Sequence, residues 1–301
     1  MVKDGKPRRG SLQFSPRVRA KTQLPRVRSW PEADGMLGFV GYKVGMLTAR
    51  VATKNAQSPM SGKKLARAVT VIEVPPMILR AVRLYGKTPY GSKVLTELTN
   101  EKDFKGAEAD FARLVFETQP RLAGFPKKLP EEVEIAYGGD LEATMKFASE
   151  NLKKEVRFSD VFSVGGFADF TGVTKGKGLQ GPVKRFGVKL LSHKAEKSRR
   201  KPGTLGPWTP KKTGWQVPMA GQTGFHTRTE YNKQIIKLGN GDMNPKSGWK
   251  RYGLVKSDYA LVLGTLLGPP KRALMIRKPL RAGGKIPYEL QGIIVDGKVV
   301  K

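Results

Sequence analysis

Basic and flat side chains gather between residues 172 and 233. This stretch holds fourteen Lys and Arg, two acids (Glu196 and Glu230) and two tryptophans, Trp208 and Trp215. Glycine and proline recur in it and apolar periodicity almost vanishes, so it cannot bury enough apolar surface to fold alone. Its cations can neutralise a phosphate backbone, and its rings can stack on bases. We expect an extended arm that becomes ordered against RNA.

The residues predicted to bind RNA lie in this arm and in a basic segment at the N-terminus. Residues 1–30 hold nine Lys and Arg and one acid, Asp4. The candidates in the N-terminal segment are Arg8, Arg9, Arg17, Arg19, Lys21, Arg26 and Arg28. Those in the arm are Lys175, Lys177, Lys184, Arg185, Lys197, Arg199, Arg200, Lys201, Trp208, Lys211, Lys212, Trp215, His226 and Arg228. For His226, a ring that contacts RNA and a ring that binds a nearby backbone carbonyl are equally good interpretations.

The charge of the whole chain also indicates a polyanionic partner. Fifty-six Lys and Arg against twenty-five Asp and Glu give a formal net charge of +31. A membrane surface is the competing polyanion, but we find no basic amphipathic helix. The longest apolar run, residues 259–268, is far shorter than the roughly 20 residues that span a bilayer. The basic N-terminus lacks the apolar core of a secretory signal, so we expect a cytoplasmic protein without membrane contact.

The sequence gives little material for catalysis. It has no Cys, which excludes disulfides and thiolate metal sites. His193 and His226 are its only histidines, and neither has a metal-ligand spacing with carboxylates. No nucleophile elbow or phosphate loop occurs. We therefore predict no enzyme activity, no cofactor and no metal.

One glycine motif imitates a dinucleotide site. Residues 176–181 (GKGLQG) have the spacing of a dinucleotide-binding turn, which must open directly into a helix. Pro182 follows, and we predict no helical continuation after it. The glycines then serve either to let the backbone approach a polynucleotide closely or to form a turn without contacts.

The rest of the chain is expected to consist mainly of strands. Short apolar runs with glycine- and proline-rich connections favour a sandwich or barrel. Glycines at 38, 41 and 45 suggest bends or close backbone approaches, and Trp30 is a candidate core anchor. The predicted strands are Leu37–Val51, Ala68–Val74, Met77–Tyr85, Phe162–Val173, Asp258–Leu267 and Lys271–Leu280. One long helix is expected over Leu141–Lys153, with Asp140 as its cap and Leu141, Met145, Ala148 and Leu152 on one face.

Charge and pattern divide the chain into four predicted parts. Residues 1–35 form a basic N-terminal tail, and 173–232 form the basic central arm. A β-rich body comprises 36–90 with 156–172 and 233–301. Because most acids and the helix fall between 91 and 155, we assign that segment to an α+β insert.

The arm resembles the universal large-subunit ribosomal protein three (L-three) family. The spacing of Phe162, Asp169, Gly172, Thr174, Gly176-Lys177-Gly178, Gly181 and Arg185 reproduces that family's signature. Further similarity to its archaeal branch lies in Gly10-Ser11-Leu12, Pro16-Arg17, Gly35–Met46, Pro202-Gly203, Gly206-Pro207-Trp208, residues 220–226, Arg228-Thr229-Glu230 and Asn232. The resemblance spans nearly the whole chain.

The resemblance implies a β-barrel like that of translation-factor second domains, with an α/β insert, an N-terminal tail and a central arm. It implies a structural protein that binds large-subunit rRNA early in assembly, near its 3′ end. The arm, with Trp208 at its tip, is expected to reach toward the peptidyl-transferase region. Expected neighbours are L-fourteen and the archaeal L-twenty-four-e type, and no homo-oligomer is expected. The modified histidine of eukaryotic members has no counterpart, because Glu196 stands there.

Two other classes share the charge of this chain. A nucleoid DNA-binding protein needs a groove-reading helix or a dimer spacing, and we find neither. An rRNA-modifying enzyme needs a cofactor loop or a catalytic residue in a structured setting. Co-sedimentation with the large subunit in high salt would separate these classes from a ribosomal protein.

Overall fold

The computed structural model describes residues 7–53, 55–100, 109–281, 288–295 and 297–300. They form two compact units. The first unit consists of the N-terminal residues to Lys21 together with Thr174–Thr227, and the second of Thr22–Val173 and Arg228–Lys301. Lys3, Asp4 and Lys6 of the predicted basic tail lie outside the described residues.

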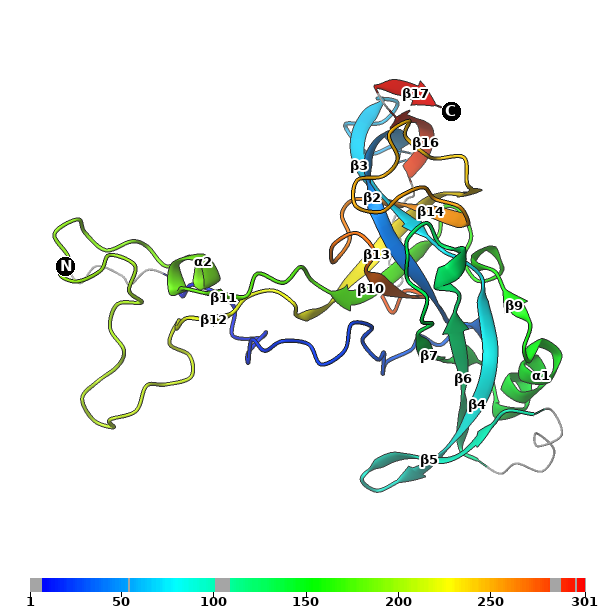
Figure 1. Cartoon of the computed structure of the whole chain (residues 1–301), viewed down its shortest axis with the longest axis horizontal. Coiled ribbons are helices and arrows are strands. Elements are labelled where there is room, and N and C mark those ends of the chain that lie inside the picture. The colour runs from blue at the N-terminus through cyan, green and yellow to red at the C-terminus, as the bar shows by residue number, and fades with distance from the viewer. Residues whose placement is uncertain (1–6, 54, 101–108, 282–287, 296, 301) are drawn as a thin grey trace. The chain divides into compact units, whose positions relative to one another are not determined.

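Strands dominate the second unit, as predicted (Figure 1). They are β1 (Gly35–Met36), β2 (Gly38–Thr53), β3 (Leu65–Glu73), β4 (Met77–Thr88), β5 (Gly91–Leu98), β6 (Phe111–Thr118), β7 (Glu132–Ile135), β8 (Tyr137–Gly138), β9 (Glu155–Val156), β10 (Phe167–Val173), β13 (Thr227–Asn240), β14 (Asp258–Leu263), β15 (Ala273–Arg277), β16 (Tyr288–Val295) and β17 (Lys298–Val300). Among the described residues, its helical elements are α1 (Leu141–Asn151) and the 3-10 turns η2 (Pro120–Leu122) and η3 (Phe158–Asp160).

The larger sheet pairs eight strands in the order β15-β10-β13-β14-β3-β2-β16-β17. β15 also pairs with β2, so the pairings run in a closed ring through β2, β3, β14, β13, β10 and β15. Its strands carry buried apolar side chains, for example Val69, Val71 and Ile72 of β3 and Ala273–Ile276 of β15. The mainly β fold is therefore confirmed.

The smaller sheet pairs β5, β4, β6 and β7, with β9 on β4. It begins at Met77, whereas the insert was predicted to begin at residue 91. The difference arises because Pro75-Pro76 ends one apolar run and starts another, and the second run, β4, pairs only within the smaller sheet. Tyr42 of β2 donates a buried hydrogen bond of 3.0 Å to Thr118 of β6, and both sheets share one apolar core.

Two glycines of β2 admit aromatic rings, as the sequence suggested. A Cβ atom on Gly38 would lie 2.9 Å from the Trp30 ring, and one on Gly45 would lie 2.6 Å from the Trp249 ring. Trp30 packs on the core, which confirms its prediction as an anchor. These contacts need glycine because any side chain would occupy the space of the ring.

The predicted helix and strands are found with shifted ends. α1 places Ala148 in the core, and Leu141 and Met145 pack against it, as predicted. Asp140 stands at the N-cap, but its side chain makes no capping hydrogen bond, so that detail was wrong. β10 starts at Phe167 rather than at residue 162, since the left-handed Gly165 makes a turn before it. β14 and β15 are likewise shorter at their ends than predicted.

A buried ion pair joins distant segments of the second unit. Asp169 accepts hydrogen bonds from the Arg277 guanidinium (3.2 Å) and from the backbone N–H groups of Asn232 and Leu280. Arg277 also donates to the Ser29 carbonyl oxygen at 2.6 Å. The side chains of Asp169 and Arg277 are 0% and 6% exposed. The pair thus fixes β10, β13 and β15 to the chain that enters the sheet.

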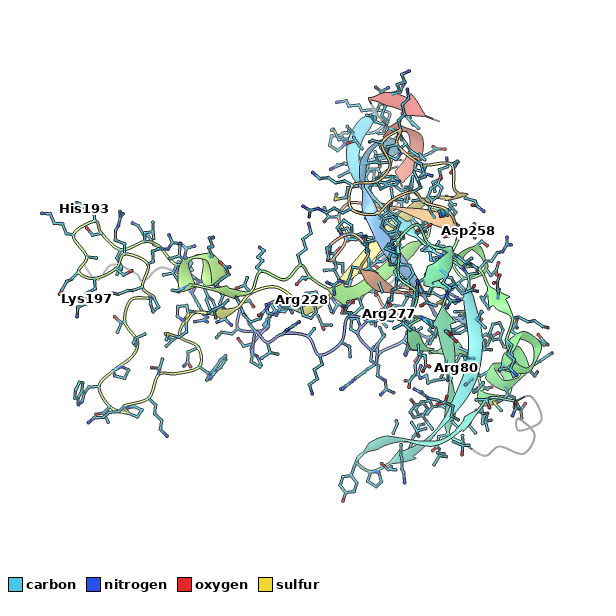
Figure 2. The ribbon with its side chains drawn as sticks, in the orientation of Figure 1. Arg80, His193, Lys197, Arg228, Asp258 and Arg277 are labelled. Carbon is cyan, nitrogen blue, oxygen red and sulfur yellow. The ribbon has the colours of Figure 1, made fainter. Side chains whose placement is uncertain are left out.

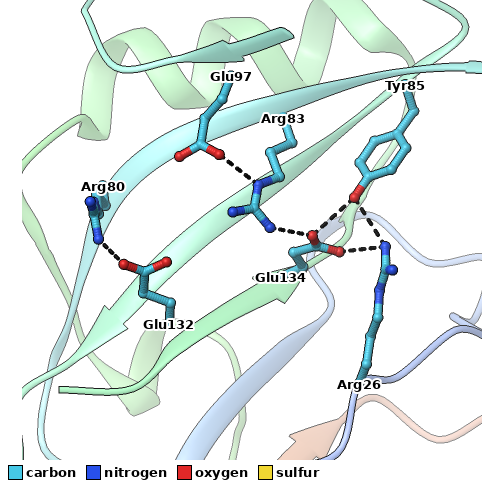
Figure 3. Close-up of polar contacts among 7 residues, drawn as sticks. All are labelled: Arg26, Arg80, Arg83, Tyr85, Glu97, Glu132 and Glu134. Carbon is cyan, nitrogen blue, oxygen red and sulfur yellow. Dashed lines mark hydrogen bonds and ion pairs between the residues drawn. The ribbon is translucent and has the colours of Figure 1, made fainter. Parts of the chain in front are cut away.

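A second set of charges lies on the smaller sheet (Figure 3). Glu134 receives Arg83 at 2.5 Å, Arg26 at 2.7 Å and the Tyr85 hydroxyl at 2.9 Å. Burial raises the pKa of this carboxyl, but the hydrogen bonds and charges of Arg83, Tyr85 and Arg26 outweigh burial and hold it below its usual value. The carboxylate is therefore ionised and its three partners are fixed.

Removal of the cation from a buried ion pair should lower the free energy of unfolding more than removal of the cation from an exposed one. Arg277→Met would leave the Asp169 carboxylate buried without a counter-charge, which should lower the free energy of unfolding by about 3–5 kcal/mol. The matched variant Arg80→Met breaks the pair with Glu132, whose two side chains are 49% and 46% exposed. It should cost at most about 1 kcal/mol. Urea unfolding of both variants measures the difference, and similar losses would contradict it.

Candidate nucleic-acid interface

The arm is built on a short two-stranded ladder in the first unit. β11 (Leu179–Gln180) pairs with β12 (Gly221–Gln222). The Lys177 N–H donates to the Thr223 carbonyl, and the Thr223 N–H donates to the Gly178 carbonyl, each at 2.9 Å. The glycine motif is therefore part of a backbone ladder between the two chains of the arm.

A helix does follow the glycine motif, so the prediction of no helical continuation was wrong. α2 (Pro182–Phe186) has proline in its first turn, where the missing N–H costs nothing, and ends at the left-handed Gly187. It is only five residues long and carries Lys184 and Arg185 in its last turn. The neighbouring backbone groups are occupied by the ladder, and no pyrophosphate site results.

Arg185 links the ladder to the N-terminal tail. Its guanidinium donates to the carbonyl oxygens of Gln222 (3.0 Å), Met219 (2.9 Å) and Arg17 (3.4 Å). A Cβ atom on Gly221 would lie 2.9 Å from the guanidinium carbon, so this close fit requires glycine there. One side chain thus connects three backbone segments.

The tail lies along the arm through further contacts. The Ala20 N–H donates to the Phe225 carbonyl at 2.8 Å, and Arg17 donates to the Arg185 carbonyl at 2.6 Å. The His226 ring nitrogen Nδ1 lies 2.8 Å from the Val18 carbonyl oxygen, to which it must donate. The interpretation of His226 as a partner for a backbone carbonyl is therefore correct.

The rest of the arm has no regular elements. Between Val188 and Ala220 the backbone hydrogen bonds join residues that are close in sequence. The largest separation is eight residues, from the Leu191 N–H to the Arg199 carbonyl oxygen, at 3.0 Å. Lys197 lies at the end of the loop that this bond closes (Figure 2). Among the described residues, Pro182 is the one apolar residue of the first unit that is buried. The segment therefore lacks a core, as its composition predicted.

Most of the predicted RNA-binding residues come together in the first unit. Those with exposed side chains are Arg8, Arg9, Arg19, Lys21, Lys175, Lys177, Lys184, Lys197, Arg199, Arg200, Lys201, Trp208, Lys211, Lys212 and Trp215. Trp208 and Trp215 are 82% and 72% exposed, and the Lys211 ammonium lies 5.3 Å from the centre of the Trp208 ring. Arg17, Arg185 and His226 are half-buried in the contacts described above.

Three predicted residues belong to the second unit. Arg26 has its charge paired with Glu134, and Arg28 is exposed. Arg228 is half-buried in β13 (Figure 2). No helix in the described part of the chain is long and apolar enough to cross a membrane. No group of three or more potential metal ligands is found among the described residues.

Comparisons with known proteins agree with this arrangement. The family described as ribosomal protein L3 matches residues 1–107 and 101–289. The chain belongs to this family. It is 44% identical to the large ribosomal subunit protein uL3 of Methanothermobacter thermautotrophicus over 95% of each chain. The uL3 proteins of Archaeoglobus fulgidus and Methanococcus vannielii are 45% and 43% identical, each over 93% of both chains.

Membership of the L3 family confirms several predictions. The chain is a structural protein of the large ribosomal subunit in the cytoplasm and works in translation; it is not an enzyme. The archaeal relatives confirm the predicted branch. The contacts of Arg17 and Arg185 were not predicted, since they use backbone acceptors that carry no signal in the sequence. For His226, a backbone carbonyl was one of the two interpretations, but its position in the tail was not predicted.

The ladder should depend on the fork of donors at Arg185. In Arg185→Lys a single ammonium group replaces the planar guanidinium. It cannot reach all three carbonyl oxygens at once, so most of these hydrogen bonds are lost. In the free chain, amide exchange at Lys177 and Thr223 should become about tenfold faster, which corresponds to about 1.4 kcal/mol of local stability. Hydrogen exchange with mass spectrometry measures this.

The control for this experiment is Lys184→Ala, an exposed cation in the same helix. It should leave both amides unchanged. Equal exchange in Arg185→Lys and the unaltered chain would show that the ladder does not need the guanidinium. The same data test a second prediction: residues 1–30 and about 185–220 should be mobile in the free protein, because they lack apolar periodicity.

Proposed function

We propose that this L3-family chain binds large-subunit rRNA chiefly by neutralising phosphates with its first unit. It would do so early in assembly and near the 3′ end of that rRNA. The central arm would support the peptidyl-transferase region, where RNA performs the chemistry. The protein's part is to neutralise, pack and position the RNA.

The distribution of charge carries this proposal. The first unit has nineteen Lys and Arg and two acids, a net charge of +17 out of +31 in 75 of 301 residues. Its one acid among the described residues is Glu196. Cations that lack acidic partners repel one another until a polyanion approaches. A phosphate backbone can supply the negative charge that these cations lack along the whole length of the unit.

The second unit suits contact with proteins. On its smaller sheet Arg26, Arg80 and Arg83 are paired with Glu132 and Glu134, so that face has little charge left for phosphates. We propose contacts there with L-fourteen and the L-twenty-four-e type. DNA binding gains no support, because α2 is too short to read a groove and lies against the ladder.

Binding by phosphate neutralisation predicts a steep dependence on salt. If about ten phosphates are contacted, the logarithm of affinity should fall against the logarithm of salt concentration with a slope of roughly −7 to −9. The slope is measured by filter binding of the chain to a large-subunit rRNA fragment at salt concentrations from about 50 to about 200 mM. A slope near −2 would mean that most of these cations stay in solvent.

Substitution of Trp208, at the expected tip of the arm, and charge reversal in the basic segment Arg199–Lys201 should affect the ribosome in different ways. A stacked aromatic is worth about 1–3 kcal/mol, a small part of a large rRNA interface. Trp208→Ala should therefore yield intact large subunits with altered tRNA or antibiotic binding near the catalytic centre. Reversing the charges of Arg199, Arg200 and Lys201 to Glu should impair assembly itself, because the loop would then repel phosphate.

Sucrose-gradient profiles measure assembly, and peptidyl transfer with tRNA affinity measures the tip. If Trp208→Ala subunits equal the unaltered ones in every assay, the tip has no functional role. If the charge reversal leaves assembly unchanged, the loop does not bind RNA.

A further inference from the structure

The first unit contains an apolar cavity of about 840 Å³ between the tail and the arm. Leu12 and Val18 of the tail, and Phe186, Trp215 and Met219 of the arm, form its apolar walls. Trp215 is 72% exposed and Val18 62% exposed, so the cavity is open to solvent on this side. Its size falls within the range of about 300–1,000 Å³ that is typical of ligand pockets.

Arg17 and Arg185 also line this cavity. Arg17 lies over the Phe186 ring at 4.1 Å, and Arg185 lies over the same ring at 5.1 Å. Their hydrogen bonds go to neutral backbone carbonyls. Burial lowers the pKa of Arg185, and the charge of Arg17 lowers it further. Two close cations with no carboxylate partner among the described residues favour an anion between or beside them.

Flat apolar walls and two arginines whose hydrogen bonds go to neutral carbonyls favour a ligand that is aromatic at one end and anionic at the other. An apolar protein side chain would fill the walls but leave the two cations without a counter-charge. A free inorganic anion would meet the cations but leave Trp215 and Leu12 in water. A nucleotide satisfies both parts.

We propose that this cavity binds one unstacked nucleotide of the RNA, with its base against Trp215 and its phosphate at Arg17 and Arg185. This rests on the proposed RNA-binding function and specifies one site within it. An unstacked base can lie on an aromatic ring as it does in single-strand binding proteins. The cavity thus adds a base-dependent contribution to an interface otherwise dominated by phosphate.

Removal of the ring tests the base contact. The probe is a fluorescein-labelled ten-nucleotide oligouridylate, compared at one salt concentration with an abasic strand of the same length. Trp215→Ala should weaken oligouridylate binding by about 5- to 150-fold, the range for one stacked aromatic, and leave abasic binding unchanged. Trp215→Phe should restore most of the affinity, because it keeps a flat ring.

Blocking the cavity gives an independent test, since the chain has no Cys and an introduced thiol is the only one. Val18→Cys modified with N-phenylmaleimide should fill the cavity and reduce oligouridylate binding to the level of Trp215→Ala. The two changes together should cause no further loss. Thr204→Cys with the same label is the matched control, because Thr204 is exposed in the arm and does not line the cavity. It should bind both strands normally.

Two negative outcomes are distinguishable. If the chain binds large-subunit rRNA, yet Trp215→Ala and the blocked Val18→Cys bind oligouridylate as the unaltered chain does, the nucleotide site is disproved and phosphate binding stands. If the unaltered chain fails to bind large-subunit rRNA, the proposed function is disproved and the site with it.

Discussion

The hydrogen bonds from the Arg185 guanidinium to three backbone carbonyls join the tail to both chains of the arm. In the first unit Pro182 is the one buried apolar residue among the described residues, so polar contacts of this kind hold the unit together in place of an apolar core. A guanidinium is suited to this, because its planar fork presents five donors in fixed directions. The glycine at 221 follows from the same contact, since a side chain there would collide with the fork.

The two units solve the problem of excess positive charge in different ways. In the second unit, Arg277 and Arg83 meet carboxylates, and the apolar core of two sheets provides the stability. In the first, the one described acid cannot offset the cations around it. The repulsion weakens this unit on its own and is relieved by a polyanion. The same charges that oppose folding of the free unit therefore favour its binding to RNA.

The sequence predicted the parts of the fold that depend on local pattern. Apolar runs located β2, β3, β4, β10, β14 and β15, and helical spacing located α1. β13 was partly assigned to the arm, because its first residues, Thr-Arg-Thr-Glu-Tyr-Asn, are mostly polar and show no apolar run; in the structure none of them is buried. α2 was missed because five residues show no period. The closing of the ring by β2 and β15 depends on pairing between distant segments, which no local pattern records.

For the candidate site, residue type predicted which side chains gather in the first unit, but not what each one contacts. Arg185 and Arg17 have the same composition signal as Lys197 and Arg200, and yet the first two hold backbone carbonyls while the last two are exposed. Similarly, Trp208 and Trp215 look alike in the sequence. Only the position of the tail shows that Trp215 lines a cavity. Carbonyl acceptors are present at every residue, so their use is decided by geometry alone.

The weak internal stability of the first unit has a consequence for assembly. A typical hydrogen bond contributes only about 0.5–1.5 kcal/mol net, so a ladder of a few bonds and one guanidinium fork is marginal. RNA that binds the ordered form adds stability by mass action. An extended segment that is completed in this way can follow the contour of the RNA over a large surface, which a prefolded domain of 75 residues could not. In the proposed mode of binding, the glycines and the guanidinium fork fix where the segment starts, and the RNA determines the path of the rest.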